Sequence, residues 1–573
     1  MTPDPAAAPS ADGTLAMLPP LQVAAADAVA WHASREMLVV GLGAAGAAAA
    51  LSAREQNIDV LVLERFDGGG ATIKSGGVVY LGGGTRLQKE AGYDDTPEAM
   101  FNYLREECGT AISAATLKQF CDGSLELFAW LEGLGVPFAS YPKPPKTSYP
   151  RNGVYLYYSG NEGVPARAAV AKPAPRGHRV KAPGIDSGRE LYRVLAEQVV
   201  ARGATVWRQS GVRRLITDAT GAVMGVEVWR FPEGSEAALK HRKLMTKAEK
   251  VHNVAGAWAD RLRQQARELE LTSAEPLRIR ATRGVVLATG GFIFNRAMVA
   301  QHAPNYVEAM RLGATGCDGS GIRLGASVGG VPTRMEKGSA WRFINPPSVW
   351  PKGVVVNREG RRFCNEQVYG ATLGVAMCDH QGGRAWLILD KALRRLAMKE
   401  ALFGKLWFFQ SVPAFFQMLF APRGKTPEAL AAKLGLPPVT LSATLRGYTQ
   451  DQRSPSGDAL GKSPDMCAPL ATAPFYALDI SANSKTFPCP TITLGGLKVN
   501  EQTGAVLNAN GESIPGLYAA GRSAVGVASN GYVSGLSIAD CLFSGRRAGA
   551  AIAASVPLSR QEEREMNSII NQE

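Results

Sequence analysis

The segment EMLVVGLGAAGAAAALSAREQNIDVLVLER, residues 36–65, decides the expected fold. An apolar strand at residues 37–40 runs into the glycine-rich turn Gly41–Gly46, then into an alanine-rich helix and a second strand that ends at Glu64. In this order the glycines permit a tight turn, let a pyrophosphate approach the backbone and let the helix pack on the strand. The helix N-terminus stabilises phosphate charge, and an acid about twenty residues further on binds ribose hydroxyls. We therefore expect a dinucleotide-binding domain.

A second glycine-rich segment, DGGGATIKSGGVVYLGGGT at residues 67–85, follows directly after the expected ribose-binding acid. Segments of this composition are often flexible linkers. Here, however, the serine, threonine and glycine residues lie between expected elements, where their backbone amides can wrap a cofactor. NAD does not need a second glycine-rich segment around it, whereas FAD is longer and would use one. We therefore expect FAD.

Two later segments return the chain to the same sheet. RGVVLATGGF at residues 283–292 has the pattern of a buried strand, and GLYAAGR at residues 516–522 follows a hairpin pattern. The expected class is α/β, with a discontinuous Rossmann-like FAD-binding domain and an inserted α+β domain for substrate binding and catalysis. The expected divisions are a flexible tail at 1–35, the FAD-binding domain at 36–292 and 484–555, the inserted domain at 293–483 and a C-terminal tail at 556–573.

Length and composition exclude several classes of protein. A chain of 573 residues is too long for one simple core, and 46% hydrophobic with 20% charged residues is ordinary globular composition. The net charge of +13 would suit nucleic acid, but the basic residues are scattered and no nucleic-acid motif accompanies them, so we expect no nucleic-acid partner. The eight cysteines are widely spread without a CxxC pair, which argues against a metal site or a disulfide framework.

The same features predict a cytoplasmic location. Unpaired cysteines are typical of a reducing compartment. The Ala/Pro-rich start of the chain lacks the basic region of a signal peptide, and no apolar run reaches the length of a bilayer span.

Two further segments are distinctive. Residues 235–271 are basic and helical in pattern, and the simplest interpretation is a solvated surface excursion. Residues 400–420 are rich in Phe and contain Trp407 and Pro413. They form either a buried helix of the inserted domain or a hydrophobic mouth that touches an apolar substrate or, as a peripheral contact, a membrane surface.

Five segments in order resemble one family of flavoproteins. They are VVGLGAAGAAAALSA, GGATIKSGG, RGVVLATGGF, GVVVNREGRRFCNE and GLYAAGR…SGLSIADCLFSGRRAG. They are similar to the flavoproteins grouped with fumarate reductases and 3-ketosteroid dehydrogenases, over residues 36 to about 552. The resemblance implies FAD in a two-domain fold, with chemistry at the flavin N5 between the domains. Some relatives attach FAD through a histidine in the second glycine loop; none is present here, so we expect non-covalent FAD.

Particular residues favour the steroid branch of this family. Fumarate-reductase-like members carry an arginine proton donor where this chain has Val349, and only six histidines are available to hold a dicarboxylate. The sequence YVSGL at residues 532–536 resembles the signature of 3-ketosteroid Δ4-dehydrogenases, which also have a tyrosine after the RF.NE motif, here Tyr369. The Δ1-dehydrogenases have a YAGAG-type sequence instead, which is absent.

The resemblance implies roles for four residues. A substrate with one polar end, a ketone, needs donors for its carbonyl oxygen, and the candidates are Tyr532 and the amide near Gly535. A hydroxyl relay through Ser534 and Tyr369 would remove the C4 proton, while the flavin N5 accepts the C5 hydride. The sequence leaves open which group polarises and which removes the proton. Tyr532 and Tyr369 also suit buried core aromatics, and Ser534 suits a helix N-cap.

A larger set of residues is expected to bind the cofactor. They are Gly41, Gly43, Ala44, Ala45, Gly46, Glu64, Arg65, Gly70, Ala71, Thr72, Ser75, Gly76, Gly77, Val212, Ala288, Thr289, Gly290, Gly521, Ser537 and Ile538.

Three alternatives stay open at this stage. A Δ1-dehydrogenase would place a tyrosine in the first quarter of the chain, for which Tyr80 or Tyr93 can be proposed. An enoate or fumarate-type reductase would consume a double bond. A non-catalytic flavoprotein would bind a membrane through the Phe-rich segment. The resemblance implies an apolar steroid ketone as substrate, whereas no second nucleotide fingerprint appears that would identify the electron acceptor.

Overall fold

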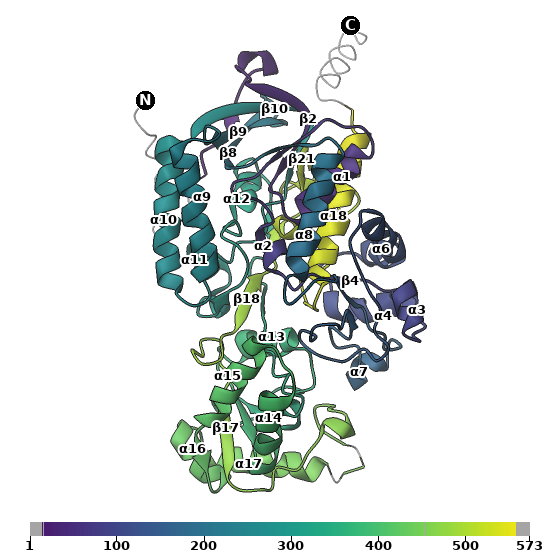
Figure 1. Cartoon of the computed structure of the whole chain (residues 1–573), viewed down its shortest axis with the longest axis vertical. Helices are drawn as coiled ribbons and strands as arrows, with labels where there is room; N and C mark the ends of the chain where they lie inside the picture. Colours follow the sequence, from purple (N-terminus) through teal and green to yellow (C-terminus); the bar gives the residue numbers. More distant parts are fainter. Residues whose placement is uncertain (1–13, 15–16, 453, 456, 557–573) are drawn as a thin grey trace.

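The computed structural model describes residues 14, 17–452, 454–455 and 457–556. The expected C-terminal tail, 556–573, lies outside the described residues except for its first position. The chain forms an elongated molecule with a large sheet domain at one end and a smaller cap domain at the other (Figure 1). The α/β class expected from the sequence is confirmed.

The large domain is built on a nine-stranded sheet with β10 at its centre. The main order is β1-β8-β9-β10-β2-β3-β7, and β21 pairs with both β10 and β20. The strands are β1 (Leu21–Gln22), β2 (Ala33–Val40), β3 (Val60–Leu63), β7 (Thr205–Trp207), β8 (Ser210–Thr217), β9 (Val223–Arg230), β10 (Glu275–Leu287), β20 (Ala505–Leu507) and β21 (Ser513–Ala519). The pairs β10–β2, β10–β21, β2–β3 and β3–β7 are parallel. The carboxyl ends of these strands therefore meet at one edge, where α/β proteins bind ligands.

Three helices cover one face of this sheet: α1 (Ala44–Arg54), α8 (Ser187–Ala201) and α18 (Leu536–Ala554) (Figure 1). Helices α1 and α18 pack closely because glycines remove side chains at the contact. A Cβ added at Gly545 would collide with the carbonyl oxygen of Ala45, and one at Gly549 with that of Ala49. The alanine-rich sequence of α1 thus serves close helix packing.

Smaller elements extend the large domain. The sheet β4-β6-β5 lies beside α18 and α4 (Figure 1). Its strands and the remaining helices are β4 (Val78–Tyr80), β5 (Leu156–Tyr157), β6 (Gly177–Arg179), α2 (Gly70–Lys74), α3 (Arg86–Glu90), α4 (Pro97–Cys108), α5 (Ala114–Asp122), α6 (Ser124–Gly133) and α7 (Pro165–Ala168).

The N-terminal segment differs from the flexible tail expected over residues 1–35. Strand β1 pairs in parallel with β8 through Leu21–Ile216, and Leu18 is buried and donates its backbone N–H to Arg213. The Trp31 indole donates to the Ala26 carbonyl at 2.6 Å. The described part of this segment is therefore attached to the sheet edge, because its few apolar residues and backbone groups find partners there.

The cap domain contains the sheet β14-β15-β17-β16 and five helices. They are β14 (Val354–Val356), β15 (Trp386–Leu389), β16 (Arg423–Gly424), β17 (Phe475–Asp479), α13 (Gly370–His380), α14 (Lys391–Phe403), α15 (Phe408–Leu419), α16 (Pro427–Leu434) and α17 (Pro438–Asp451). Most of its hydrophobic core lies between Ala340 and Cys489. Residues 317–335, with α12 (Ser320–Ser327), instead contribute to the core of the large domain. The chain therefore passes from the core of the large domain to the core of the cap later than residue 293, the boundary expected from the sequence.

A three-stranded sheet joins the two domains. It has the order β11-β18-β13, with β11 (Met310–Arg311), β13 (Gly338–Ala340) and β18 (Pro490–Thr493). Strand β18 belongs to the segment that leaves the cap, while β11 and β13 belong to the segment that enters it. The two crossings are therefore hydrogen-bonded to each other.

The segment 235–271 forms the helices expected from its pattern. Helices α9 (Glu236–Val251) and α10 (Gly256–Ser273) make an antiparallel hairpin beside the sheet domain (Figure 1). The inner faces bury Ala238, His241, Met245, Leu262 and Glu270. The hairpin is therefore more than a solvated excursion.

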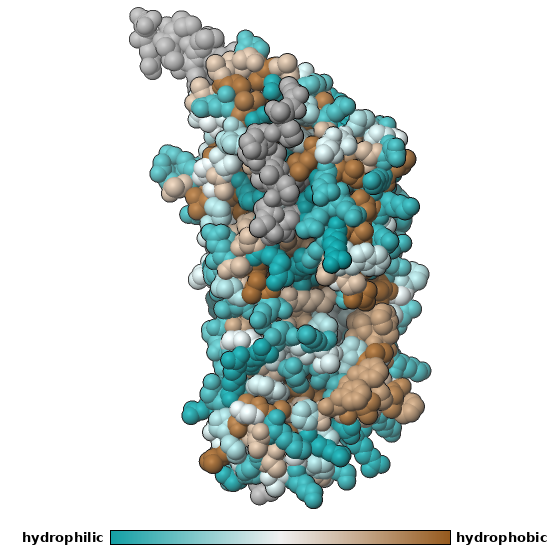
Figure 2. All heavy atoms as spheres, turned by 90° about the vertical axis from the view of Figure 1, so that its left-hand side faces the viewer, coloured by the Kyte–Doolittle hydropathy of each residue, from teal (hydrophilic) through white to brown (hydrophobic). Residues whose placement is uncertain are grey.

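The Phe-rich segment forms the end of α14 and helix α15, and it is not a buried helix. Phe403, Phe408 and Phe420 are 75%, 68% and 74% exposed. Figure 2 shows apolar side chains gathered in the lower half of the molecule, the half in which Figure 1 places these helices. None of the helices in the described part of the chain combines the length and apolar character needed to cross a bilayer.

The α1–α18 contact gives a direct test of the fold. Replacing Gly545 by Ala is expected to lower the free energy of unfolding by about 1–3 kcal/mol, since an added methyl overpacks the contact with the Ala45 carbonyl. Gly447→Ala is the matched control, because Gly447 lies inside α17 with open space at its Cβ position. That change should raise the free energy of unfolding by about 0.4–1 kcal/mol. Denaturant unfolding followed by circular dichroism measures both; equal effects would contradict the packing argument.

Candidate active site

The turn after β2 has the geometry that a pyrophosphate requires. Gly41 has φ +102°, and a Cβ there would lie 2.7 Å from the Ala288 carbonyl oxygen. A Cβ at Gly46 would collide with the carbonyl oxygen of Gly41. The Ala44 backbone N–H donates to Thr72 Oγ1 at 3.0 Å, which attaches the second glycine segment to the turn. Side chains at Gly41 and Gly46 would therefore collide with the backbone of the turn and of the neighbouring strand.

Glu64 lies at the end of β3, facing the same turn. Its carboxylate accepts the backbone N–H groups of Leu42 and Phe66, each at 2.8 Å. Burial raises the pKa of Glu64, partly offset by these two hydrogen bonds. The carboxylate is thus held by backbone donors at the edge of a cavity.

A cavity of about 370 Å³ opens at this edge of the sheet. Of the residues expected to bind a cofactor, those that line it are Gly41, Gly43, Ala44, Ala45, Glu64, Arg65, Gly70, Ala71, Thr72, Val212, Ala288, Thr289 and Gly290. Its size lies within the range of about 300–1,000 Å³ found for small-molecule sites. The bare glycine turn, the acid Glu64 that we expect to bind ribose and the helix N-terminus on its wall fit a dinucleotide.

The other expected residues lie behind or beside this lining. Gly46 packs beneath the turn, and Ser75 Oγ donates to the Thr72 carbonyl at 2.7 Å. A Cβ at Gly76 would lie 2.6 Å from the Tyr149 ring, and Gly77 packs against the Ser187 backbone. Gly521 lies between Ala45 and Cys541, while Ser537 and Ile538 are in the first turn of α18. The Arg65 guanidinium is directed to Glu270 and Asp318.

The stretch that precedes α18 brings hydroxyl groups together. Ser534 Oγ lies 3.0 Å from Tyr157 Oη, and the Ser534 N–H donates to the Ser159 carbonyl at 2.9 Å. The helix N-cap is Gly535, with no side-chain cap, so the N-cap role considered for Ser534 is wrong. The Ser534 hydroxyl is therefore free to contact a tyrosine.

Gly535 occupies a position that only glycine suits. Its φ is +91°, and an added Cβ would lie 2.7 Å from the Tyr80 backbone nitrogen. Burial raises the pKa of Tyr532 to about 12, opposed by the charge of Arg522 and by the backbone of Gly535. Tyr532 is therefore a neutral phenol near physiological pH and can donate a hydrogen bond together with the Gly535 region.

Aromatic rings connect Tyr532 to Tyr369 across the domain boundary. Trp341 stacks on Tyr532 with ring centroids 5.1 Å apart, Phe343 follows at 5.9 Å, and Tyr369 packs on Phe343 at 5.3 Å. Burial raises the pKa of Tyr369 well above its usual value, as do Tyr532 and Tyr157, while a hydrogen bond with Ser534 opposes the shift. The two tyrosines predicted from the sequence thus belong to one apolar wall that carries few polar groups.

Sequence reasoning missed Tyr157 as a member of this cluster. Burial raises its pKa, and a hydrogen bond with Ser534 opposes the shift. Its strand, β5, pairs with β6 and lies 377 residues before Ser534 in the chain. The aromatic run YLYY at residues 155–158 was the available signal, although such a run is more often a strand core.

The two tyrosines considered for a Δ1 enzyme lie differently. Tyr80 is fully buried, stacks on Tyr103 and directs its hydroxyl to Glu162 at 3.3 Å. Tyr93 packs edge-on against Tyr158 with ring centroids 6.0 Å apart. Neither hydroxyl contacts Ser534 in the described structure.

A second cavity, of about 280 Å³, borders Tyr369 on the cap side. Its lining includes Phe343, Gly160 and Lys146. Burial lowers the pKa of Lys146 to about 8, and its ammonium donates to the Gln367 carbonyl at 2.7 Å. The space behind Tyr369 is therefore open and carries a titratable group.

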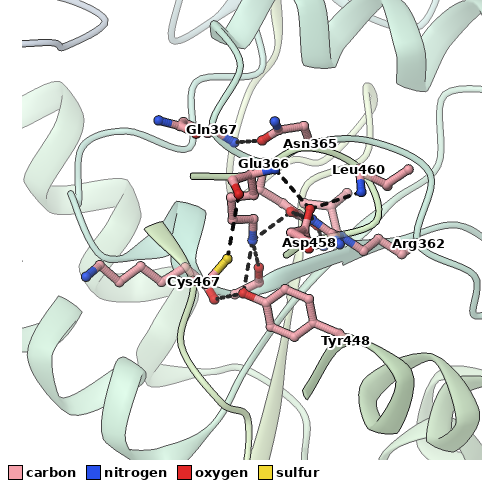
Figure 3. Close-up of polar contacts among 12 residues, drawn as sticks. Arg362, Asn365, Glu366, Gln367, Tyr448, Asp458, Leu460 and Cys467 are labelled. Carbon is pink, nitrogen blue, oxygen red and sulfur yellow. Dashed lines mark hydrogen bonds and ion pairs between the residues drawn. The ribbon is translucent and has the colours of Figure 1, made fainter. Parts of the chain in front are cut away.

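A buried ion network holds the segment that leads to Tyr369 (Figure 3). Arg362 pairs with Glu366 and Asp458, and Lys462 pairs with Glu366 at 2.7 Å with both side chains fully buried. The Gln367 side chain accepts the Ser463 N–H at 3.0 Å. Because breaking a buried pair is costly, this network fixes the backbone just before the tyrosine. The segment corresponds to the NREGRRFCNE motif read from the sequence.

Comparisons with known proteins agree with this geometry. The family model described as "FAD binding domain" matches residues 36–538. A 3-oxo-5-alpha-steroid 4-dehydrogenase of Comamonas testosteroni is 44% identical over 87% of this chain and 95% of its own length. A 3-oxosteroid 1-dehydrogenase of Mycolicibacterium smegmatis is 26% identical over 92% and 98%.

A solved structure extends the likeness to three dimensions. It is that of a 3-ketosteroid-delta4-(5alpha)-dehydrogenase from Rhodococcus jostii in complex with 4-androstene-3,17-dione, with a TM-score of 0.76 and 30% identity. The match covers 94% of this chain and all of that one. The chain therefore belongs to the FAD-binding flavoprotein family that includes these 3-oxosteroid dehydrogenases, and FAD is its cofactor.

Proposed function

We propose that this protein is an FAD-dependent 3-ketosteroid Δ4-dehydrogenase, which introduces the C4–C5 double bond into a 3-ketosteroid of the 5α series. The observation that carries the proposal is the hydroxyl cluster of Tyr157, Ser534 and Tyr369 on an aromatic wall that also holds Tyr532. The similarity to dehydrogenases that act on 5α steroids at this position supports it.

Polarisation of the ketone is assigned to Tyr532 and the backbone N–H of Gly535. The C4 proton is weakly acidic, so negative charge develops on the carbonyl oxygen as that proton leaves. A neutral phenol and a fixed amide can stabilise this charge in a site from which water is excluded, and each such donor is commonly worth about 3–4 kcal/mol at the transition state. The high pKa of Tyr532 keeps the phenol protonated for this role.

Removal of the C4 proton is assigned to Tyr369 acting with Ser534. Tyr157 would complete the relay, since its hydroxyl lies 3.0 Å from that of Ser534. The electron pair of the C4–H bond becomes the second, π bond between C4 and C5, and the C5–H electron pair leaves with hydrogen as hydride. FAD, when bound, supplies the hydride acceptor.

Non-covalent attachment of FAD is part of the proposal. Among the residues that the structure describes, none that lines the cavity is a histidine, and the second glycine loop contains none in its sequence. The backbone turn at Gly41–Gly46, the carboxylate of Glu64 and the segment Gly70–Thr72 would hold the cofactor, with Val212 and the residues Ala288–Gly290 completing the wall. Precipitation of the protein by acid should then release all of the flavin into solution.

Membrane contact through α14 and α15 is the proposed route for an apolar substrate. Residues 391–425 contain seven Lys and Arg residues but one acidic residue, beside the exposed phenylalanines. Helices with an apolar face and basic flanks bind anionic lipid surfaces. Trp407 donates its indole N–H to the Pro150 carbonyl at 2.9 Å, so the patch adjoins the loop that precedes β5 and Tyr157.

The function is tested by anaerobic reduction of the bound flavin. We expect a saturated 5α-3-ketosteroid to bleach the flavin absorbance and to yield a product with a C4–C5 double bond, with its 5β epimer much slower. Product analysis by mass spectrometry and NMR identifies the bond. A C1–C2 alkene would instead indicate a Δ1-dehydrogenase, and no bleaching by either epimer would refute the steroid function.

The catalytic assignments predict specific losses of activity. Tyr369→Phe should lower the rate of flavin bleaching by about 10²–10⁴, the usual contribution of a general base. Tyr532→Phe should lower it by about 10²–10³, the usual contribution of one oxyanion donor. Tyr93→Phe is the matched control and should change little, and all three should keep the flavin spectrum.

The pH dependence separates a base from a packing residue. Burial raises the pKa of Tyr369 above its usual value of about 10, so its ionised fraction grows about tenfold per pH unit from pH 7 to 9. The bleaching rate should rise with pH over this range and should lose that slope in Tyr369→Phe. If the bleaching rate of the wild type does not change with pH over this range, a group other than Tyr369 removes the C4 proton.

The membrane contact predicts binding to lipid vesicles. The protein should sediment with vesicles that contain anionic phospholipid, and the triple change Phe408→Ser, Phe416→Ser and Phe420→Ser should abolish this. Val439→Ser is the control, because Val439 is 79% exposed but lies outside the patch, on α17. Equal sedimentation of both variants would contradict a role for α14 and α15.

A further inference from the structure

The hairpin α9–α10 lies against the FAD cavity. Met245, Thr246, Glu249 and Lys250 of α9 line the same space as the glycine turn. In Figure 1 the two helices stand side by side next to the sheet domain, away from the cap. The five segments that resemble the flavoprotein family lie outside this hairpin, so the resemblance implies no role for it.

Glu249 connects two walls of the cavity. Its carboxylate pairs with Lys74 of α2 at 3.3 Å and accepts the backbone N–H and hydroxyl of Thr315, at 2.9 and 2.5 Å. Burial raises the pKa of Glu249, but the Thr315 hydrogen bonds and the charge of Lys74 lower it overall. The residue is therefore a stable anion that joins α9 to both sides.

Helix α10 is attached to the wall behind Glu64. Glu270 pairs with Arg65 at 3.0 Å, with Arg213 at 3.2 Å and with His241 of α9 at 3.2 Å. At the rim, Arg242 pairs with Asp67 at 2.8 Å. These contacts join the hairpin to the residues that follow β3, where the expected ribose-binding acid lies.

Cations exceed anions in this wall. Arg213 and Arg267 lie close to Arg65, and burial lowers the pKa of each to about 10. In the described structure the Nε atoms of Arg213 and Arg267 have no hydrogen-bond partner. A buried cation of this kind favours an anionic occupant nearby, and Arg213 also lines the cavity.

Ion pairs hold the hairpin against the cavity. Its own hydrophobic cluster is small, with three buried residues, Ala248, Ala259 and Leu262. The pairs that Glu270 makes with Arg65 and Arg213 are buried, and breaking a buried pair is costly. The closed position is therefore the stable one, and the hairpin can move away from the cavity only when these ion pairs break.

We propose that the hairpin α9–α10 is a clasp that completes the FAD site. The four α9 residues form the outer wall of the cavity, Glu249 is the positioning residue that keeps the clasp closed, and FAD enters and leaves when it opens. The proposal concerns retention of the cofactor and does not depend on the steroid chemistry, so each can fail without the other.

The test is the rate at which FAD leaves the holoenzyme. After dilution, the fluorescence of released FAD should rise about tenfold faster in Glu249→Gln than in the wild type, since one charged contact is lost. Glu268→Gln is the matched control, because that exposed acid lies on the outer face of α10. Equal release rates in the wild type and Glu249→Gln would overturn the proposal.

Hydrogen exchange gives an independent measurement on the unmodified protein. Amides of α9 should exchange more slowly in the holoenzyme than after removal of the flavin, because bound FAD supports the closed clasp. The cap helix α17 should show the same exchange in both states. Identical exchange of α9 with and without FAD would also overturn the proposal, whatever the stability of the variants.

Discussion

The close packing of α1 against α18 is the constraint on which both ends of the site depend. The glycine turn that begins at Gly41 leads into the N-terminus of α1, and the N-terminus of α18 follows directly after Ser534 and Gly535. Glycines at the contact let the two helix backbones approach each other, so the distance between the turn and the hydroxyl cluster is set by main chain. Flexible side chains have little part in that spacing, which suits a reaction whose two partners must meet within a fraction of an ångström.

Short sequence patterns were sufficient to predict those elements whose structure depends on neighbouring residues in the chain. The strand, turn and helix at residues 36–54, the return strand before Ala288 and the helix after Gly535 all follow from short-range rules of turn geometry and periodicity. Tyr532, Ser534 and Tyr369 were found through a resemblance, and the structure brings them near one another. Periodicity alone would have predicted buried core aromatics for the two tyrosines and a helix N-cap for Ser534.

Contacts between distant residues account for what the sequence did not predict. Tyr157 and Ser534 are 377 positions apart, and Arg65 and Glu270 are 205 apart. No pattern of spacing encodes such a pair in a single sequence. The N-terminal segment illustrates the same limit, because its composition is that of a tail while Leu18 and β1 find partners on β8. The sequence of the Phe-rich segment is compatible with a buried helix and with an exposed one. Which of the two forms depends on the face that α15 turns to the solvent, and composition does not determine that face.

The sheet that joins the two domains has a mechanical consequence. Strands β11, β13 and β18 come from both crossings of the chain, so the cap is attached by a hydrogen-bonded ribbon and not by two independent tethers. Hydrogen bonds between the two crossings keep them at a fixed spacing. Trp341, which stacks on Tyr532, follows β13 directly. The ribbon therefore also sets how closely the cap side of the aromatic wall approaches the Tyr532 side.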